Sequence, residues 1–185
     1  MLGDGSEVRA RALVLATGME YDVPDVPGFA ELWGGAVFHC PFCHGWDVRD
    51  RPVVVYGAGE VAERQAALIA GWTDDVTVVD PGDVAGVRVE GGALQAVLRR
   101  DGSEVPCDAV LVHAPLRRRD ALPERLGLEL TDIGLVAVDA QMHTSLPGVY
   151  AAGDLAVAPQ QVAIALGSGH IAGMVAAREL LIGRD

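Results

Sequence analysis

Two cysteines three positions apart, Cys40 and Cys43, carry the clearest chemistry in this sequence. Thiols at this spacing can close into a disulfide and reopen, so the pair predicts the handling of electron pairs. A pair at the start of a helix also gains acidity, because the free backbone N–H groups there favour the thiolate. The flanking His39 and His44 can add positive charge or move protons.

Three other uses of this segment compete with redox chemistry. Residues 40–44 match the pattern for covalent haem attachment, but that reaction requires an exported protein and no signal peptide is evident. A zinc site requires four converging ligands, and because no second CxxC or paired-histidine motif follows, we expect no metal. Cys-Pro-Phe-Cys also resembles a glutaredoxin active site, although that fold places its CxxC after the first strand, without glycine-rich turns on both sides.

Composition and charge exclude several classes of function. The formal net charge of −12 repels phosphate backbones and anionic lipid, so we expect no nucleic-acid partner. All 14 basic residues are arginine, which excludes Schiff-base chemistry and a phosphate-loop lysine. No apolar run approaches the ~20 residues needed to cross a bilayer. We therefore expect a cytoplasmic protein without membrane contact, in which a close cysteine pair does redox work.

The elements around the cysteines predict an α/β fold. An apolar run at 12–16 reads as a buried strand, whereas the prolines and glycines of 22–34 indicate a connector. Residues 52–80 then have strand, helix, strand order, which predicts a right-handed parallel crossover. The segments that follow are a meander with turns at 91–92 and 101–102, a strand at 109–112, a loop around 117–123, a strand at 149–152 and a final helix from about 161 to 181.

The turn after the strand at 52–56 fits the pattern G-x-G-x-x-A, with Gly57 and Gly59 as its glycines. Such a turn lets the backbone approach a pyrophosphate at the start of a helix. Asp80 ends the next strand about 20 residues later, near the spacing for binding a ribose hydroxyl. Glu60 would face the pyrophosphate with a negative charge, which counts against binding. Dinucleotide binding and a purely structural turn therefore both remain open.

Other polar residues have structural explanations as well as functional ones. Thr17-Gly18 and Gly153-Asp154 each end an apolar strand, where α/β folds gather their ligands, but each alone is more often a turn. Cys107 precedes a buried strand and is expected to be an inert core thiol. The run 117–119 (Arg-Arg-Arg) is expected to be a solvated loop, with a phosphate contact as the alternative. The remaining histidines, expected to be satisfied or exposed, are His113, His143 and His170.

Taken in order, these motifs resemble the low-molecular-weight thioredoxin reductase family of FAD-dependent pyridine nucleotide-disulfide oxidoreductases. The motifs are Ala16-Thr17-Gly18, Cys40-x-x-Cys43, Gly57-x-Gly59 and Gly153-Asp154. The string 39–46 (His-Cys-Pro-Phe-Cys-His-Gly-Trp) is similar to a branch that includes the dithiol oxidases of gliotoxin and holomycin biosynthesis. The resemblance implies Rossmann-like three-layer nucleotide-binding domains with an antiparallel meander.

The resemblance also implies a domain order and cofactor contacts. Residues 1–34 would be a remnant of the FAD-binding domain, 35–114 a shortened NAD(P)-binding-like domain with the CxxC, and 115–185 the C-terminal part of the FAD-binding domain. Cys43 would face the flavin, Cys40 would attack the substrate disulfide, and His44 would serve as acid or base. The implied flavin contacts are Asp154 to the ribityl chain, Gln161 and Val162 to the pyrimidine end, and Thr17 and Gly18 beside the cofactor.

Two departures from the family qualify its cofactors. The family begins with a G-x-G-x-x-G unit for the ADP half of FAD, and nothing before Met1 supplies it, so we expect this chain alone to bind FAD poorly. The nucleotide domain is shortened after Asp80, and residues 79–83 are acidic where NADPH-binding reductases carry basic residues. NADH is therefore favoured over NADPH, with no nicotinamide as a further alternative.

The sequence thus predicts a flavin-linked dithiol/disulfide oxidoreductase. Its substrate would be a small thiol or disulfide, or a thioredoxin-like protein, and the resemblance also allows a homodimer. One alternative is an oxygen-dependent oxidase of small-molecule dithiols. The other is a truncated, non-catalytic remnant that keeps the fold without bound FAD.

Overall fold

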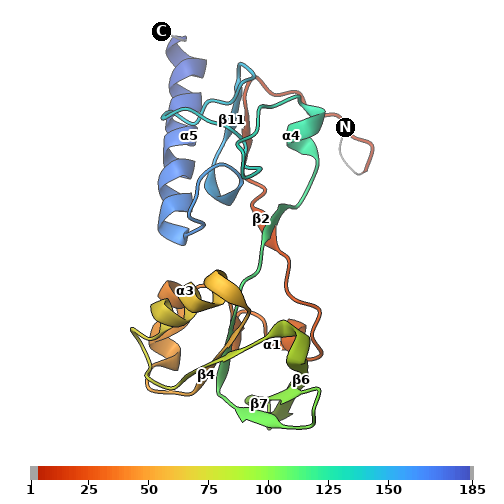
Figure 1. The fold of residues 1–185 in the computed structure, drawn as a ribbon. Coiled ribbons are helices and arrows are strands. Elements are labelled where there is room, and N and C mark those ends of the chain that lie inside the picture. The colour runs from red at the N-terminus through yellow and green to blue at the C-terminus, as the bar shows by residue number, and fades with distance from the viewer. Residues whose placement is uncertain (1–3, 184–185) are drawn as a thin grey trace. The chain divides into compact units, whose positions relative to one another are not determined.

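The structure is a computed structural model that describes residues 4–183. The chain forms two compact units, which can be followed in Figure 1. The insert unit comprises Tyr21–Pro115, and the split unit comprises the residues up to Glu20 together with those from Leu116 onward. Within residues 4–183, none of the helices combines the length and the apolar character needed to cross a bilayer.

The insert unit is built on a four-stranded parallel sheet. Its strands, in spatial order, are β3 (Val37–Phe38), β9 (Ala109–Val112), β4 (Val53–Tyr56) and β5 (Val76–Val79). The strands are short and rich in valine, as expected where both faces of a parallel sheet are covered. The helix α3 (Gly59–Ile69) connects β4 to β5. This order confirms the strand, helix, strand unit predicted from the sequence.

Alternate residues of β4 supply the two cores of the insert unit. Val53 and Val55 pack on one face with Ala62 and Ile69 of α3. Val54 points to the opposite face and joins a second buried cluster that includes Phe29. Because successive side chains of a strand point to opposite faces, four consecutive apolar residues are enough to join both layers to the sheet.

The predicted meander is confirmed as a three-stranded antiparallel sheet. It consists of β6 (Val84–Glu90), β7 (Ala93–Arg99) and β8 (Glu104–Pro106). Gly91 and Gly92 form the turn between β6 and β7 with φ angles of 59° and 83°, which glycine adopts without strain. The short helix η2 (Pro81–Asp83) separates β5 from β6. The chain therefore enters the meander directly from the end of the parallel sheet.

The segment expected to be a connector, 22–34, is part of the insert unit. It contains a short helix, α1 (Phe29–Leu32), and Phe29 is fully buried. Tyr21, Val23 and Val26 pack against the same buried cluster. The boundary between the compact units thus lies at 20/21 rather than at the expected 34/35, because these apolar side chains are anchored in the core that follows them.

The split unit joins the first and last parts of the described chain. The strand β1 (Leu13–Leu15) pairs in parallel with β11 (Val149–Ala151). A second pair is formed by β2 (Met19–Tyr21), which spans the unit boundary, and β10 (Leu116–Arg118). The helices are α4 (Leu122–Arg125), η3 (Gly153–Leu155) and the long α5 (Val162–Ile182), which confirms the predicted C-terminal helix.

The run 117–119 is not the solvated loop that the sequence predicted. Two of its residues belong to β10, where Arg117 pairs with Glu20 at 2.9 Å. Arg118 pairs with Glu124 and donates a hydrogen bond to the carbonyl of Gly134. Arg117 and Arg118 are therefore held by partners elsewhere in the chain, which a local pattern of charge does not reveal, whereas Arg119 is exposed.

Candidate functional site

The two cysteines of the CxxC lie at the start of a short helix. Cys40 is the N-cap of α2 (Pro41–His44), and the N–H groups of Cys43 and His44 donate to its carbonyl at 3.2 Å. Proline at the first helical position fits because its missing N–H would have no partner there. The Sγ atoms of Cys40 and Cys43 lie 2.8 Å apart. A movement of less than about 1 Å would bring them to disulfide bonding distance.

The two thiols differ in their access to solvent. Cys40 is buried, with 8% of its surface exposed, whereas Cys43 is exposed. Phe42, beside Cys43, is 71% exposed, and Trp46, one turn further on, is 62% exposed. Arg49 stacks over the Trp46 ring at 4.1 Å from its centroid. The accessible thiol therefore has two large, exposed aromatic residues near it in sequence.

A glycine holds the CxxC helix close to the body of the insert unit. Gly45 opens the short helix η1 (Gly45–Val48), which continues directly from α2. A Cβ atom at Gly45 would lie 2.4 Å from the ring of Trp72, far inside van der Waals contact. Trp72 also packs edge-to-face against Trp46. The position of the cysteines thus depends on a glycine and a tryptophan that the sequence did not single out.

The two histidines that flank the cysteines have different surroundings. The ring of His39 lies 4.0 Å from the tilted ring of Tyr21 and stacks on Trp33 at 5.7 Å, both measured between ring centroids. Burial lowers the pKa of His39, and repulsion from His44 lowers it further, which favours a neutral ring. His44 Nε2 lies 3.3 Å from the Gly34 carbonyl, and its Nδ1 is buried without a hydrogen-bond partner among residues 4–183.

The glycine turn brings β4 and α3 close together. A Cβ at Gly57 would lie 3.1 Å from the Cβ of Ala62, so β4 and α3 approach closely where only glycine fits easily. Gly59 has a φ of 60°, and nothing lies within 4 Å of its would-be Cβ. Asp80 follows β5 as predicted, whereas Glu60 in the first turn of α3 is exposed and opposes an anion there.

Three of the residues expected at the flavin, Gly18, Gly153 and Asp154, lie around one hollow within the split unit. A hollow of about 220 Å³ is lined by Ala16, Gly18, Ala152, Gly153, Asp154, Ala165 and Gly169. Thr17 Oγ1 is buried and has no hydrogen-bond partner among the described residues, which fits a polar group supplied by a ligand. The hollow is smaller than the roughly 300–1,000 Å³ of complete ligand pockets.

The start of α5 lies in the same unit as this hollow. Gln161 is its N-cap, and Val162, at its first position, is 79% exposed, so the N–H groups of the first turn are accessible. Sequence reasoning missed Ser168, a buried residue one and a half turns further along α5. Its Oγ accepts a hydrogen bond from the Gly153 N–H and donates to the carbonyls of Ile164 and Ala165.

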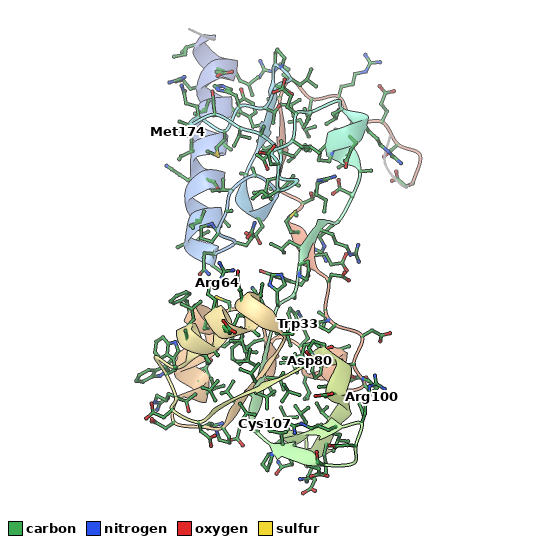
Figure 2. All side chains as sticks on the ribbon, viewed as in Figure 1. Trp33, Arg64, Asp80, Arg100, Cys107 and Met174 are labelled. Carbon is green, nitrogen blue, oxygen red and sulfur yellow. The ribbon has the colours of Figure 1, made fainter. Side chains whose placement is uncertain are left out.

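Other candidate residues have structural surroundings. Cys107 is 1% exposed, and burial raises the pKa of its thiol to about 11 (Figure 2). His143 Nδ1 lies 2.8 Å from Asp139, and its Nε2 lies 2.5 Å from Glu179. The described part of the chain has no cluster of three or more His, Cys, Asp or Glu residues arranged to hold a metal.

Comparison with known proteins places the whole pattern in one family. A family model described as pyridine nucleotide-disulphide oxidoreductase matches residues 1–89 and 82–169. The thioredoxin reductase tcpT of Claviceps purpurea is 32% identical over 96% of this chain and 64% of its own length. A thioredoxin reductase of Listeria monocytogenes is 29% identical over 89% of this chain and 61% of its own length.

Solved structures give the same result. The crystal structure of HlmI superimposes with a TM-score of 0.85 at 32% identity, covering 92% of this chain and 60% of HlmI. A putative thioredoxin reductase TrxB of Bacillus anthracis shares the fold with a TM-score of 0.87 at 24% identity, covering 96% of this chain and 67% of its own. The chain spans 64% of the length of the Claviceps thioredoxin reductase and 61% of the length of the Listeria one. It belongs to the pyridine nucleotide-disulphide oxidoreductase family.

Proposed function

We propose that the protein is a flavin-linked dithiol/disulfide oxidoreductase in which Cys40 and Cys43 exchange an electron pair with a sulfur substrate. The observation that carries this proposal is the 2.8 Å separation of the two Sγ atoms, with Cys43 exposed and Cys40 buried. The names of the relatives, which include several thioredoxin reductases, support the same chemistry. FAD, when bound, supplies a store for two electrons beside the pair.

The exchange is a balanced two-electron reaction. One thiolate of the pair attacks a sulfur of the substrate disulfide, whose S–S bond breaks as a mixed disulfide forms and the first substrate thiol leaves with a proton. The second cysteine attacks the sulfur of the bonded cysteine, which releases the second substrate thiol and leaves a disulfide between Cys40 and Cys43. The substrate gains two electrons and two protons. The reverse sequence oxidises a dithiol.

The separate roles of the two thiols are also proposals. The resemblance assigns Cys43 to the flavin and Cys40 to the substrate. The exposure of Cys43 is compatible with contact to a flavin, whereas the burial of Cys40 means that α2 must shift before Cys40 can meet a substrate. His44 Nε2 lies 3.3 Å from the Gly34 carbonyl, so Nδ1, which has no partner among residues 4–183, is the ring nitrogen that would accept or donate a proton. The role of Cys40 therefore involves a movement of α2 that can be measured.

The residues that would hold FAD are those around the hollow in the split unit. Asp154, which lines this hollow, would accept hydrogen bonds from the ribityl hydroxyls, and the buried Thr17 Oγ1 would donate to or accept from the cofactor. The first-turn N–H groups of α5 would donate to the pyrimidine oxygens, because they have no partner within the helix. A nicotinamide dinucleotide would lie on the turn of Gly57 and Gly59.

The substrate is proposed to be a disulfide of a thioredoxin-like protein or a small disulfide. The thioredoxin reductases among the relatives support the protein disulfide. The exposed side chains of Phe42 and Trp46 offer an apolar surface to a protein or to a small disulfide. A cytoplasmic location follows from the same chemistry, since a reducing compartment keeps such a pair available as a dithiol.

Equilibration with glutathione buffers of graded redox potential tests the proposal. Mass spectrometry after rapid alkylation should show one reversible disulfide between Cys40 and Cys43, absent from Cys40→Ser and Cys43→Ser and kept in Cys107→Ser. The matched control, Cys107→Ser, removes a buried thiol of the same unit. If the two thiols remain reduced throughout while the protein stays folded, the protein is a non-catalytic remnant of the family.

A further inference from the structure

The parallel sheet of the insert unit has an unpaired edge at β5. In the order β3, β9, β4, β5, no strand of the described chain lies beyond β5. The short helix η2 follows β5 and leads into the meander, which forms a separate sheet. An unpaired edge presents a row of backbone N–H and C=O groups on which another strand can pair. Within residues 4–183, this edge is therefore left without a neighbour.

The hydrogen bonds of β5 show which backbone groups this edge presents. The carbonyls of Asp75 and Val79 accept hydrogen bonds from the side of β4, at 2.9 and 3.1 Å. In a parallel pair, alternate residues direct both of their backbone groups to the same neighbour, so Val76 and Val78 direct theirs to the unpaired side. An added strand would therefore meet the N–H and C=O groups of these two valines.

The side chains of β5 give the edge an apolar surface. Val79 joins the buried cluster that includes Phe29, whereas Val76 packs on the opposite face, against the cluster that includes residues of α3. Because side chains alternate along a strand, Val78 shares the face of Val76, and it is 45% exposed. Lysine, proline and bulges commonly block natural edges, and residues 76–79 contain none of these. The exposed part of Val78 thus offers a contact to an apolar side chain of an added strand.

The charges at the two ends of β5 select among possible partners. Asp74 and Asp75 are exposed, and neither carboxylate has an ion pair or a hydrogen bond within residues 4–183. At the other end, Arg100 offsets part of the charge of Asp80, since its Nε donates to the Gly82 carbonyl at 3.0 Å (Figure 2). Antiparallel pairing with the β5 of a second copy would bring the acidic ends together, and like charges that face each other destabilise a strand pair. A strand with basic residues at the start of β5 meets no such repulsion.

We propose that the edge of β5 binds an extended segment of a partner protein, which has alternating apolar residues and carries basic residues beside Asp74 and Asp75. The segment adds a fifth strand to the four-stranded sheet and pairs with the backbone groups of Val76 and Val78. Main-chain hydrogen bonds supply the affinity, and the contacts of Val78 and the two carboxylates supply the specificity. This interaction does not depend on the exchange chemistry of the cysteine pair.

Fluorescence anisotropy with labelled peptides tests the proposal on the 185-residue chain. One peptide has alternating valine and threonine with arginines at both ends, and the matched peptide has glutamates in place of the arginines. We expect the arginine peptide to bind at least about fivefold more tightly at low ionic strength. Its binding should slow amide hydrogen exchange at Val76 and Val78, because both N–H groups become hydrogen-bonded. Attraction to charges elsewhere on the surface does not protect these two amides.

Two variants separate backbone pairing from charge. Val78→Pro removes an outward N–H without removing a hydrogen bond to β4, and it should weaken binding of the arginine peptide at least about fivefold. The double variant Asp74→Asn/Asp75→Asn should weaken it at least about threefold. The matched control, Glu129→Gln/Asp132→Asn, removes the same charge from exposed residues of the split unit and should change the affinity less than about twofold. Thermal unfolding checks that each variant is folded, and the double variants decide the outcome if Val78→Pro is not.

Three results would overturn the proposal. An equal loss of affinity in both double variants, or unchanged exchange at Val76 and Val78 with peptide bound, would show attraction to the net charge of the chain rather than an added strand. Binding of neither peptide would exclude the edge as a docking site for basic strands. A dimer of the unchanged chain in sedimentation that Val78→Pro dissociates would assign the edge to a second copy.

Discussion

The backbone N–H of Gly153 donates a hydrogen bond to Ser168 Oγ at 3.0 Å, which ties the loop carrying Asp154 to the long helix α5. Gly153 has a φ of 68°, a conformation that glycine adopts readily and that turns its N–H toward the helix. Ser168 is buried and has its own hydroxyl hydrogen directed to carbonyls of the preceding helical turn. A lone pair of Ser168 Oγ therefore accepts the hydrogen bond from the Gly153 N–H, which holds the loop in place.

Ser168→Ala should lower the free energy of unfolding by about 1 kcal/mol, because it leaves the half-buried Gly153 N–H without its acceptor. Urea unfolding measures the loss, and amide hydrogen exchange at Gly153 should become faster. Ser168→Thr keeps an Oγ and should retain most of the exchange protection. Ser103→Ala, whose hydroxyl bonds only the exposed Asp101, should change stability by less than about 0.5 kcal/mol. Unchanged exchange at Gly153 in Ser168→Ala would show that the bond does not hold the loop.

The sequence predicted those parts of the fold that depend on local pattern. The strand at 53–56, the turn at 57–59 and the helix at 59–69 follow from a buried run, two glycines and helical periodicity. The final helix also follows from its apolar pattern, although Ser168 did not stand out in it. A hydroxyl that serves a loop 15 residues earlier leaves no local pattern in sequence.

The contacts that the sequence could not predict join residues distant along the chain. Phe29 lies in a proline-rich segment that reads as a connector, yet it is buried in the insert unit. Arg100 meets Gly82 across the meander, 18 residues away, so the charge at the end of β5 was misread as purely acidic. Such contacts depend on sheet register and hairpin geometry, which local composition does not fix.

Gly45→Ala should displace or strain the CxxC helix. The added Cβ would lie 2.4 Å from the Trp72 ring, so either the tryptophan or α2 must move. Overpacking of this kind costs about 1–3 kcal/mol of stability, and the rate of disulfide formation between Cys40 and Cys43 should also change. Gly167→Ala is the control, since its Cβ meets nothing within 4 Å and alanine favours a helix interior by about 0.5–1 kcal/mol. Urea unfolding compares the two; equal stability of both variants would contradict the predicted clash.

Alkylation of the reduced protein should rank its three thiols. Cys43 is exposed and should react first, Cys40 is 8% exposed and should react at least about tenfold more slowly, and Cys107 should react last. The Cys107 thiol is 1% exposed with a pKa of about 11, so little thiolate is present near neutral pH. Timed iodoacetamide labelling with peptide mass spectrometry measures the three rates. Labelling of Cys107 as fast as Cys43 would be inconsistent with a closed core in the insert unit.

The network around His143 should make stability depend on pH. Hydrogen bonds to Asp139 and Glu179 raise the pKa of His143, and Tyr150 also donates to Glu179. A raised pKa means that folding favours the protonated ring. The contribution is therefore complete below the ordinary histidine value of 6.5 and is lost as pH rises through the higher pKa of the folded state.

The free energy of unfolding should thus fall as the pH rises above the ordinary histidine value of 6.5. Urea unfolding at several pH values measures the slope. His143→Gln should flatten this slope, whereas His170→Gln, which removes an exposed histidine of α5, should leave it unchanged. A slope that persists in His143→Gln would assign the titration to another group.

The last prediction separates the roles of Cys40 and Cys43 in protein loaded with FAD. If Cys43 faces the flavin, Cys40→Ser leaves a thiolate against an electron-poor ring and should produce a long-wavelength charge-transfer band. Cys43→Ser should lack that band, and its remaining Cys40 should form a stable mixed disulfide with substrate, because no second thiol is present to release it. Both variants should lose turnover, while Cys107→Ser keeps it, since that thiol is buried. A band in Cys43→Ser and none in Cys40→Ser would reverse the two roles. The flavin would then face the buried Cys40, and the substrate would meet the exposed Cys43. Turnover that survives in either single variant would remove the pair from the mechanism.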